Sequence, residues 1–341
     1  MSKDLAIVIL NWNGKKHLET YIPSVVKNSG NSRVILADNA STDDSINFIK
    51  KNYPTIEIVE NTENGGFAKG YNEALKNVDA TYYCLLNSDV EVTPGWTETP
   101  IKVLQENSDV AICQPKIKDY LNKDYFEYAG AGGGFIDQLG YPFCRGRIFN
   151  SLEKDTGQYD DECEIFWATG ACMFIKSAIF HELNGFDANY FAHMEEIDLC
   201  WRIKNRGYKI KYNGNSTVYH LGGGTLSNIN PKKTFLNFRN SLLTLYKNEP
   251  KESKSSVIFK RMVLDGIAGV KFLLEGKPKH LMAILKAHQS YYQLKKDYKK
   301  VAAISFQKTP DRYQGLVIVE HFLKGKKYFN QLKKGFSFSR N

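Results

Sequence analysis

The sequence of 341 residues predicts an α/β fold in which a parallel sheet is covered by helices on both faces. Hydrophobic residues make up 42% of the chain and charged residues 24%, which excludes a disordered or low-complexity protein and allows a sizeable core. Short apolar runs rich in Ile, Val, Leu or Tyr alternate with segments of helical spacing, and each run ends in a polar cluster. These runs cover residues 5–10, 34–37, 56–59 and 82–86.

The segments between these runs have the apolar spacing of amphipathic helices, in which hydrophobic residues recur every three or four positions. Strand–helix alternation of this kind is typical of a parallel sheet. The residues that carry the spacing are Leu18, Ile22, Val25 and Val26, then Ile46 and Ile49, then Ala68, Ala74 and Leu75.

Shorter patterns predict the elements farther along the chain. The Gly-Ala-Gly-Gly-Gly run at 130–134 indicates a loop, because no further Gly stands at the spacing of a dinucleotide fingerprint. Residues 164–175 resemble a strand broken at a glycine, and residues 177–183 and 195–206 resemble helices. A short strand is expected at 217–219.

The composition of the chain changes near residue 231, where long Lys-rich helical segments begin. We therefore expect two parts, residues 1–230 and a basic, mainly helical region of residues 231–341. Residues 251–341 contain 20 Lys and Arg but only 6 Asp and Glu. Residues 1–250 contain 26 Lys and Arg and 31 Asp and Glu, so the excess of positive charge lies in the C-terminal region. The formal net charge of +9 would suit a nucleic-acid-binding module, but no RNA- or DNA-binding signature accompanies it.

The six cysteines form no Cys-x-x-Cys pair and lie among apolar neighbours, which favours buried reduced thiols over disulfides or zinc. No stretch offers the roughly 18–20 apolar residues that span a bilayer. The apolar run at 5–10 is too short for a secretory signal. We therefore expect a cytoplasmic protein.

Ligands of open α/β sheets bind beyond the carboxyl ends of the strands, so the polar clusters after the apolar runs hold candidate site residues. Asn11 and Asn13 follow the first run, and Asp38 and Asn39 follow the second. Asp38 is placed to accept hydrogen bonds from a nucleobase or ribose. The alternative is an ordinary helix start with the hydroxyl residues at 41–42 as N-cap.

Paired glycines precede the third helical segment, where Asn64 and Gly66 stand before the helix and Asn72 lies within it. Glycine permits a positive φ and a close approach of the backbone to a ligand. A helix N-terminus also suits a phosphate. A plain strand-to-helix turn is the alternative, and the pattern taken alone favours that turn.

Asn87, Ser88 and Asp89 follow the most apolar run. Folding alone explains poorly why a carboxylate emerges from a buried strand at the ligand end of the sheet. Oxygen ligands of this kind suit Mg²⁺ or Mn²⁺ bridging a diphosphate, so Asp89 is the candidate metal ligand. A turn in which Asp89 accepts local hydrogen bonds is the alternative.

Three acids, Glu195, Glu196 and Asp198, lie within four residues at the start of a helical segment. Their mutual repulsion raises the pKa of at least one of them, which suits a general base. The alternative is a set of acids favoured by the helix dipole, with Asp198 paired to Arg202. We favour this structural role for Asp198 and a chemical role for the two glutamates.

His220 ends the expected short strand and is followed by a glycine-rich loop at 222–224. A lone His is more often structural than functional. Beside such a loop, His220 could complete a metal site or contact a phosphate.

Seven motifs in this order resemble those of glycosyltransferase family 2, and most closely those of its bacterial rhamnosyltransferase-type members. The resemblance covers roughly residues 5–225. The motifs are Asn-Trp-Asn-Gly (11–14), Asp-Asn-Ala-Ser-Thr-Asp (38–43), Asn-x-Gly-Phe-Ala-x-Gly-x-Asn (64–72), Leu-Leu-Asn-Ser-Asp (85–89), Gly-Ala-Cys-Met-Phe-Ile (170–175), Gly-Phe-Asp (185–187) and Glu-Glu-Ile-Asp-Leu-Cys-Trp-Arg (195–202).

The resemblance implies a GT-A fold and inverting transfer from a nucleotide-diphosphate sugar, with residues 1–230 as the catalytic part. It implies Mg²⁺ or Mn²⁺ bound by Asp89, and it places His220 where some members hold the same metal. Asn87 stands where the family's D-x-D motif has its first acid, so one usual carboxylate is missing. The donor contacts that it implies are Asn11, Asn13, Asp38, Asn39, Asn64, Gly66, Asn72, Asn87 and Ser88.

Glu195 and Glu196 correspond to the family's Glu-Asp pair, whose second acid is usually the base, so the resemblance gives that role to Glu196. Inverting transfer needs one base for the acceptor hydroxyl and a cation to stabilise the leaving diphosphate. A nucleotidyltransferase acting on sugar phosphates is the alternative enzyme. It would be expected to carry a glycine-rich, Arg/Lys-bearing phosphate loop after the first strand, which this sequence lacks.

The resemblance leaves the donor open between deoxythymidine-diphosphate rhamnose and a uridine-diphosphate hexose. The implied acceptor is a glycan or a polyprenyl-diphosphate-linked sugar in cell-surface polysaccharide synthesis. We expect the basic region to lie on anionic headgroups at the inner face of the cytoplasmic membrane, near such an acceptor. The alternative is that its helices only pack on the catalytic part.

Overall fold

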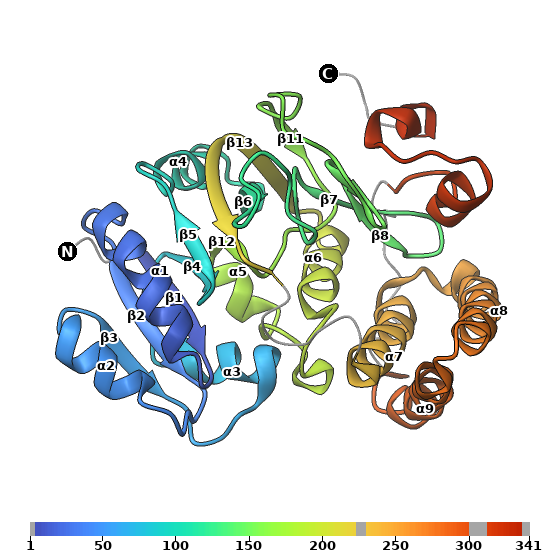
Figure 1. The fold of residues 1–341 in the computed structure, drawn as a ribbon, viewed down its shortest axis with the longest axis horizontal. Helices are drawn as coiled ribbons and strands as arrows, with labels where there is room; N and C mark the ends of the chain where they lie inside the picture. The colour runs from blue at the N-terminus through green and yellow to red at the C-terminus, as the bar shows by residue number, and fades with distance from the viewer. Residues whose placement is uncertain (1–3, 223–229, 300–311, 336–341) are drawn as a thin grey trace.

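The computed structural model describes residues 4–222, 230–299 and 312–335. Its centre is a nine-stranded sheet in the order β11-β13-β6-β12-β4-β1-β2-β3, with β5 paired to β13 (Figure 1). The strands of this sheet are β1 (Leu5–Asn11), β2 (Arg33–Asp38), β3 (Glu57–Glu60), β4 (Tyr82–Asn87), β5 (Val90–Val92), β6 (Val110–Asp119), β11 (Glu162–Glu164), β12 (Cys172–Lys176) and β13 (Lys209–His220).

Helices cover both faces of this sheet, and the strands supply a separate hydrophobic core to each face. In β1, Ala6 and Val8 belong to one core while Ile7 and Ile9 belong to the other, as the two-residue period of a strand requires. Helices α3, α5 and α6 pack in the first core, and α1, α2 and α4 pack in the second. These helices are α1 (Lys15–Asn28), α2 (Ser45–Asn52), α3 (Gly66–Leu75), α4 (Glu98–Glu106), α5 (Ser177–Glu182) and α6 (Glu195–Asn205).

The predicted α/β class is confirmed, and strand direction divides the sheet into two halves. Strands β1 to β4 are parallel to one another, whereas β12 lies antiparallel between β4 and β6. The register pairs Asn11 with Asp38 and Leu10 with Asn87. The polar residues after β1, β2 and β4 therefore emerge at one edge of the sheet, as the sequence predicts.

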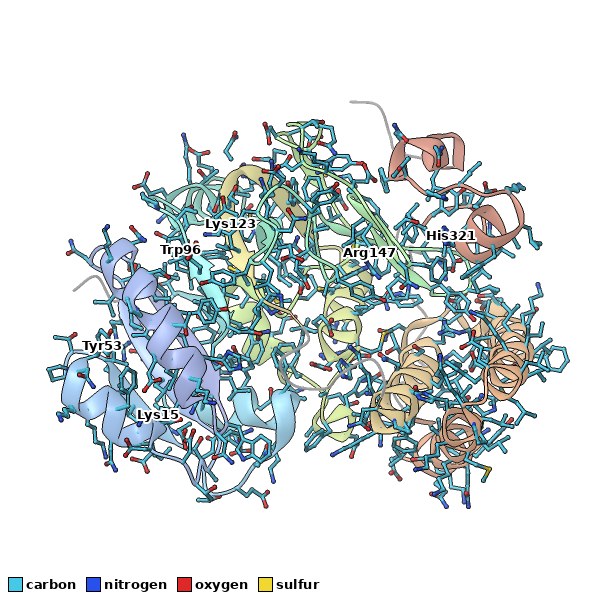
Figure 2. The ribbon with its side chains drawn as sticks, in the orientation of Figure 1. Lys15, Tyr53, Trp96, Lys123, Arg147 and His321 are labelled. Carbon is cyan, nitrogen blue, oxygen red and sulfur yellow. The ribbon has the colours of Figure 1, made fainter. Side chains whose placement is uncertain are left out.

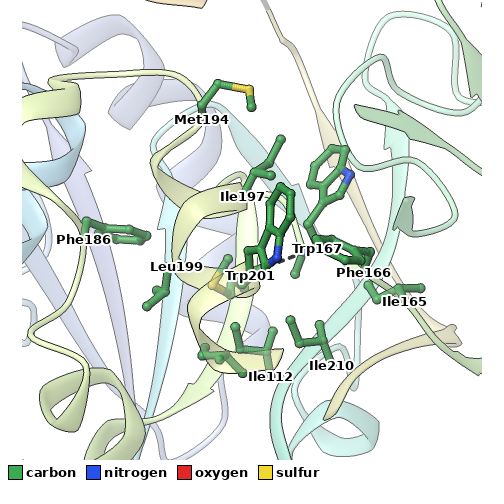
Figure 3. Close-up of a cluster of buried hydrophobic side chains, with 14 of the residues drawn as sticks. Ile112, Ile165, Phe166, Trp167, Phe186, Met194, Ile197, Leu199, Trp201 and Ile210 are labelled. Atoms are coloured by element: carbon green, nitrogen blue, oxygen red, sulfur yellow. Dashed lines mark hydrogen bonds between the residues drawn. The ribbon is translucent and has the colours of Figure 1, made fainter. Parts of the chain in front are cut away.

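The expectation of one broken strand at 164–175 is confirmed only for its last part, which belongs to β12 from Cys172 onward. Strand β11 ends at Glu164, and the buried segment between the two strands has only an isolated β-bridge, from Trp167 to Gly134. Its amides bond to separate partners: Ile165 to the carbonyl of Ile210, and Phe166 and Trp167 to that of Gly134. The apolar pattern reflects packing beneath α6, where the rings of Phe166 and Trp201 are 5.4 Å apart (Figure 3).

Two smaller expectations also differ from the structure. Asp44 occupies the N-cap of α2, so the hydroxyl residues at 41–42 do not cap that helix. The strand expected at 217–219 is the end of the much longer β13. The Gly-rich run at 130–134 forms a loop that leads into strand β7, as expected.

A small second sheet projects from the main one and is covered by the C-terminal segment. The rings of Phe135 and Phe329 lie 5.1 Å apart, and those of Phe149 and His321 lie 5.0 Å apart. Figure 2 labels Arg147 on this sheet and His321 beside it. The elements are β7 (Gly134–Ile136), β8 (Pro142–Cys144), β9 (Arg147–Ile148) and β10 (Ser151–Leu152), with the π-helix Val319–Leu323 and the 3₁₀-helix Phe329–Gly335.

Three long helices follow the main sheet: α7 (Pro231–Asn248), α8 (Lys251–Leu274) and α9 (Pro278–Leu294). Helix α7 lies next to α6 (Figure 1), and its Leu242 and Leu243 belong to the same buried core as Trp201. In the described part of the chain, no helix combines the length and apolar character needed to cross a bilayer. All six cysteines are free thiols and five are buried, which confirms the expectation of reduced cysteines.

A fully buried carboxylate joins α6 to α7. Asp198 accepts hydrogen bonds from Arg202 Nε at 2.8 Å, Lys247 Nζ at 2.9 Å and Asn248 Nδ2 at 2.9 Å. Burial raises the pKa of Asp198, but the charges of Lys247 and Arg202 lower it by more, so the net shift is downward. The structural role expected for Asp198 is confirmed, with α7 supplying partners that the sequence pattern did not reveal.

A second contact from α7 holds the loop that precedes α6. The buried Asn240 donates from Nδ2 to the carbonyl oxygens of Tyr190, Ala192 and His193, at 3.1, 3.1 and 2.7 Å. This loop contains three non-glycine residues with positive φ, namely Phe191 at 64°, His193 at 71° and Met194 at 73°. Such backbone conformations cost energy and persist only where surrounding contacts hold them. Asn240 therefore fixes the entry to Glu195.

Replacing Asn240 with Leu keeps a buried side chain of similar size but removes the donor to these carbonyls. We expect the free energy of unfolding to fall by about 1–3 kcal/mol, because buried acceptors lose their partner. Hydrogen exchange at residues 190–196 should accelerate while β1 and β4 keep their protection. Hydrogen-exchange mass spectrometry measures this, with Asn237→Leu on the same helix as the matched control. Equal exchange in the two variants would contradict the role of Asn240.

Candidate active site

The loops after β1 and β2 are joined by hydrogen bonds between their polar side chains. Asn11 Nδ2 donates to Asp38 Oδ1 at 3.0 Å and to Ser41 Oγ at 3.1 Å. Asp38 Oδ2 accepts from the Ser41 amide at 2.8 Å, and Asn13 Oδ1 accepts from the Thr42 amide at 2.7 Å. Asn11 and Asp38 are nearly inaccessible, and within the described residues the buried Asn11 Oδ1 has no partner.

The Asp38 loop is also tied to the loop before α3. Asn39 Nδ2 donates to Asn64 Oδ1 and to the Gly66 carbonyl, both at 3.0 Å. Asn64 Oδ1 accepts from the Gly66 amide at 2.9 Å. The structure therefore brings Asn11, Asn39 and Asn64 together through two successive loops.

Gly66 lets the loop before α6 approach the start of α3. Its φ is +72°, and a Cβ there would lie 2.4 Å from the carbonyl oxygen of Phe191. The amide of Phe67 donates to that oxygen at 2.7 Å. The Phe67 amide at the N-terminus of α3 is therefore bonded to the protein itself, although the sequence alone indicated that this N-terminus suits a phosphate.

Asn72 is held inside the protein by both ends of its amide. Nδ2 donates to the Phe186 carbonyl at 2.6 Å, and Oδ1 accepts from the Phe186 amide at 2.9 Å. Among the candidate donor contacts, Asn72 thus joins α3 to the Gly-Phe-Asp segment at 185–187. A contact between Asn72 and a ligand stays a prediction.

Asp89 and His220 meet beyond the end of β4. His220 Nε2 lies 3.1 Å from Asp89 Oδ1 and 3.4 Å from Asn87 Nδ2. Its other ring nitrogen, Nδ1, lies 3.6 Å from Oε1 of the buried Glu127. Ser88 stands between Asn87 and Asp89, with its Oγ beside Gly14 after β1. The glycines that follow Gly222 lie outside the described residues.

The pKa values of Asp89 and His220 shift in opposite directions. Burial raises the pKa of Asp89, but His220 lowers it by more, so the net shift is downward. Burial lowers the pKa of His220, but Asp89 and Glu127 raise it by more, to about 10. Without another cation, the imidazolium therefore pairs with the two carboxylates.

The donor set of Asp89 and His220 fits a divalent cation only in part. One carboxylate and one imidazole lie 3.1 Å apart and contact each other, and both are ligand types that Mn²⁺ accepts. No group of three or more His, Cys, Asp and Glu side chains suited to a metal occurs within the described ranges. Substrate oxygens would therefore have to complete the coordination, as is usual for Mg²⁺ bound with phosphates.

Glu195 and Glu196 open helix α6 directly after the loop held by Asn240. Burial raises the pKa of Glu196 to about 7, and burial with the neighbouring Glu196 raises that of Glu195 well above its usual range. Each has a buried Oε2 without a partner in the described structure. Glu195 is almost inaccessible, whereas Glu196 keeps part of its surface exposed. Of the two glutamates, Glu196 is therefore the one with more exposed surface.

The sequence pattern did not reveal two residues next to these groups. Glu127 follows the irregular stretch after β6, and Asn240 lies in a Lys-rich helix. Neither stands in a recognisable motif, so only the three-dimensional contact identifies them. A buried acid between two aromatic residues, Phe126 and Tyr128, was the one available signal for Glu127.

The profile of glycosyl transferase family 2 matches residues 6–183, which is more than half of the chain. An N-acetylglucosaminyl-diphospho-decaprenol L-rhamnosyltransferase of Mycobacterium tuberculosis is 24% identical over 239 residues, 64% of this chain and 76% of that protein. The rhamnosyltransferase WbbL of Escherichia coli is 39% identical over 46 residues, 14% of this chain and 17% of that protein.

Solved structures show the same fold. S. aureus TarS (residues 1–349) in complex with UDP-GlcNAc superimposes with a TM-score of 0.55 at 14% identity, covering 84% of this chain and 81% of TarS. The mannosyltransferase PcManGT from Pyrobaculum calidifontis, in complex with GDP-Man and Mn²⁺, gives 0.52 at 13% identity, covering 84% of this chain and 86% of that one.

The family match and the sheet edge agree on one class of enzyme. The match begins in β1 and includes the loops after β1, β2 and β4, where the candidate site residues gather. It favours a glycosyltransferase over the nucleotidyltransferase and nucleic-acid-binding alternatives. The chain therefore belongs to glycosyltransferase family 2, and it is a nucleotide-sugar-dependent glycosyltransferase with a GT-A-like fold and C-terminal helices.

Proposed function

We propose that the protein is an inverting hexosyl- or rhamnosyltransferase in cell-surface polysaccharide synthesis. Its donor is deoxythymidine-diphosphate rhamnose or a uridine-diphosphate hexose, and residues 1–230 form the catalytic part. The similarity to rhamnosyltransferases supports the first donor, and the TarS complex with UDP-GlcNAc is the neighbour in favour of the second. The observation that carries the proposal is the partly exposed Glu196, whose carboxylate has a raised pKa and an oxygen without a partner among the described residues, together with a sheet edge rich in hydrogen-bonding side chains.

Glu196 is the proposed base that removes the proton from the acceptor hydroxyl as the sugar is transferred. A base with a pKa near 7 is half ionised at neutral pH and still basic enough to take up a proton. Glu195 is proposed to assist as the protonated neighbour of this base, because burial and the charge of Glu196 raise the pKa of Glu195 well above its usual range. Asp198 cannot share this role, because Arg202 and Lys247 hold it as a paired carboxylate.

The nucleoside is proposed to bind at the edge formed by β1 and β2. Asp38 would accept hydrogen bonds from the base or ribose, and Asn11, Asn13, Asn39, Asn64, Gly66 and Asn72 would shape this part. Asn87 and Ser88 would lie next to the diphosphate. Asp89 and His220 would hold Mg²⁺ or Mn²⁺, and such an ion stabilises the negative charge of a departing diphosphate. The Mn²⁺ in PcManGT supports this assignment.

Glu196→Gln should lower the rate of sugar transfer by about 10²–10⁴-fold, because the amide cannot accept the proton. Binding of the donor should be unchanged. The wild-type rate should rise with pH up to about 7, because the base acts in its ionised form. Radiolabelled-sugar transfer and calorimetry measure the two quantities, with Glu182→Gln on α5 as the control. A loss of less than about tenfold would contradict the assignment.

Asp89→Ala should abolish the gain in donor affinity that Mn²⁺ provides, because it removes the carboxylate ligand. Titration calorimetry of the nucleoside diphosphate, with and without Mn²⁺, measures this gain independently of turnover. The exposed Asp79 supplies the control, since Asp79→Ala makes the same chemical change away from the site. An unchanged Mn²⁺ effect in Asp89→Ala would rule out the metal role.

The acceptor is proposed to be lipid-linked, and the enzyme to work at the inner face of the cytoplasmic membrane. The decaprenol named for the M. tuberculosis relative supports such an acceptor. An exposed apolar stripe along α8 supports the membrane contact: Phe259, Ile267 and Leu274 are 68%, 61% and 83% exposed. Residues 251–299 contain eleven Lys and Arg and four Asp and Glu, so the surroundings complement anionic lipid.

The triple variant with Phe259→Ser, Ile267→Ser and Leu274→Ser should lose binding to phosphatidylglycerol vesicles in flotation assays. Each serine removes apolar surface that would enter the bilayer. Leu121→Ser is the matched control, because Leu121 is 78% exposed on the catalytic part. Equal binding of both proteins would contradict the proposed surface, and so would binding to neutral vesicles as strong as to anionic ones.

A further inference from the structure

An open groove lies between the N-terminal parts of α7 and α9. It has a volume of about 450 Å³. Its walls combine apolar surface with three lysines, and among the described residues no acid lines it. The lining residues are Pro231, Lys232, Phe235, Pro278, Lys279, Met282, Ala283 and Lys286.

The lysines of the groove are available for an anion. Lys232, Lys279 and Lys286 make no ion pair with any residue that the structure describes, whereas Lys271 and Lys277 nearby both pair with Glu275. Each unpaired ammonium can bind a phosphate oxygen through a charge-assisted hydrogen bond. The two helices that begin here add positive potential from their N-termini. The groove therefore suits a ligand with more than one negative charge.

The rest of the groove suits hydrocarbon. Phe235, Met282 and Ala283 form an apolar wall, and Met282 and the neighbouring Leu285 are about half exposed on the outer side of α9. A hydrocarbon chain leaving the groove therefore meets more apolar surface. Free phosphate has no apolar part that could contact this wall.

One lysine connects the groove to the catalytic loop. Lys232 Nζ lies 4.7 Å from the centre of the Phe191 ring, and Phe191 belongs to the loop that Asn240 holds in front of Glu195. A diphosphate bound by Lys232 would thus place the group attached to it beside that loop.

We propose that this groove binds the diphosphate and the first isoprenoid units of a lipid-linked acceptor, with Lys232, Lys279 and Lys286 as the diphosphate ligands. This inference rests on the proposed function, which it deepens by assigning an acceptor site. The diphosphate lies in the groove, the chain passes along Met282 and Leu285 towards the membrane, and the attached sugar faces the loop before Glu196.

Farnesyl diphosphate, a short soluble isoprenoid diphosphate, tests the groove by calorimetry without any donor. We expect it to bind at least about tenfold more tightly than either farnesol or inorganic pyrophosphate, because only it uses both walls. The double variant Lys279→Glu, Lys286→Glu should weaken this binding by about tenfold or more. Both lysines are exposed, so the fold should tolerate the change. Met282→Asp, in the apolar wall, should weaken it as well.

The control double variant is Lys296→Glu, Lys299→Glu, which changes the same charge at exposed positions after α9. Equal weakening in both double variants would overturn the proposal, because binding would then follow overall charge. Equal affinity for pyrophosphate and farnesyl diphosphate would contradict the isoprenoid part of the proposal, because the groove would then bind anions only. Displacement of farnesyl diphosphate by phosphatidylglycerol vesicles would assign it to bulk lipid. Donor binding is measured separately from binding of farnesyl diphosphate. A groove that does not bind farnesyl diphosphate would therefore not contradict the proposed sugar transfer, and loss of the proposed sugar transfer would not contradict binding in the groove.

Discussion

The buried carboxylate of Asp198 is the interaction on which the arrangement of the candidate catalytic residues depends. It is fully buried, and two cations and an amide surround it, one from α6 and two from α7. A carboxylate in this environment is stable only with its partners, and losing one leaves an uncompensated charge. Helix α7 is therefore fixed against α6, and its Asn240 is fixed under the strained loop that leads into Glu195.

The same interaction separates three neighbouring acids by their ionisation. Asp198 has strong cationic partners, so its pKa falls, whereas Glu195 and Glu196 have none among the described residues and their pKa values rise. All three lie in the first turn of α6, so the helix dipole alone cannot account for the difference. The partners of Asp198 come from the next turn and from α7. Local sequence can place acids at a helix start, but a distant helix determines which of them is paired with a cation.

This dependence explains what could be predicted from the sequence. The strands of the first ninety residues follow from short apolar runs that alternate with segments of helical spacing, and their register brings Asn11, Asp38 and Asn87 to one edge. Contacts between distant segments leave no such pattern in the sequence. Asn240 acts on carbonyls 47 to 50 residues away, and Glu127 lies near His220 from a loop without regular structure. The buried stretch from Ile165 to Trp167 differs from the prediction for the same reason. Its residues are apolar because they pack beneath α6, and an apolar composition of this kind resembles that of a strand.

The basic charge of the C-terminal region divides into two groups with different physical roles. Buried cations neutralise buried acids: Lys247 pairs with Asp198, Arg261 with Asp265, and Arg312 with Glu249. These cations are neutralised by neighbouring acids, so they contribute little to the charge of an outer surface. The lysines of α8 and α9 that remain exposed lie beside apolar residues. A nucleic acid would need the charge without the apolar stripe, whereas an anionic lipid surface uses both. The net charge thus points to a partner only after the paired cations of the core are set aside.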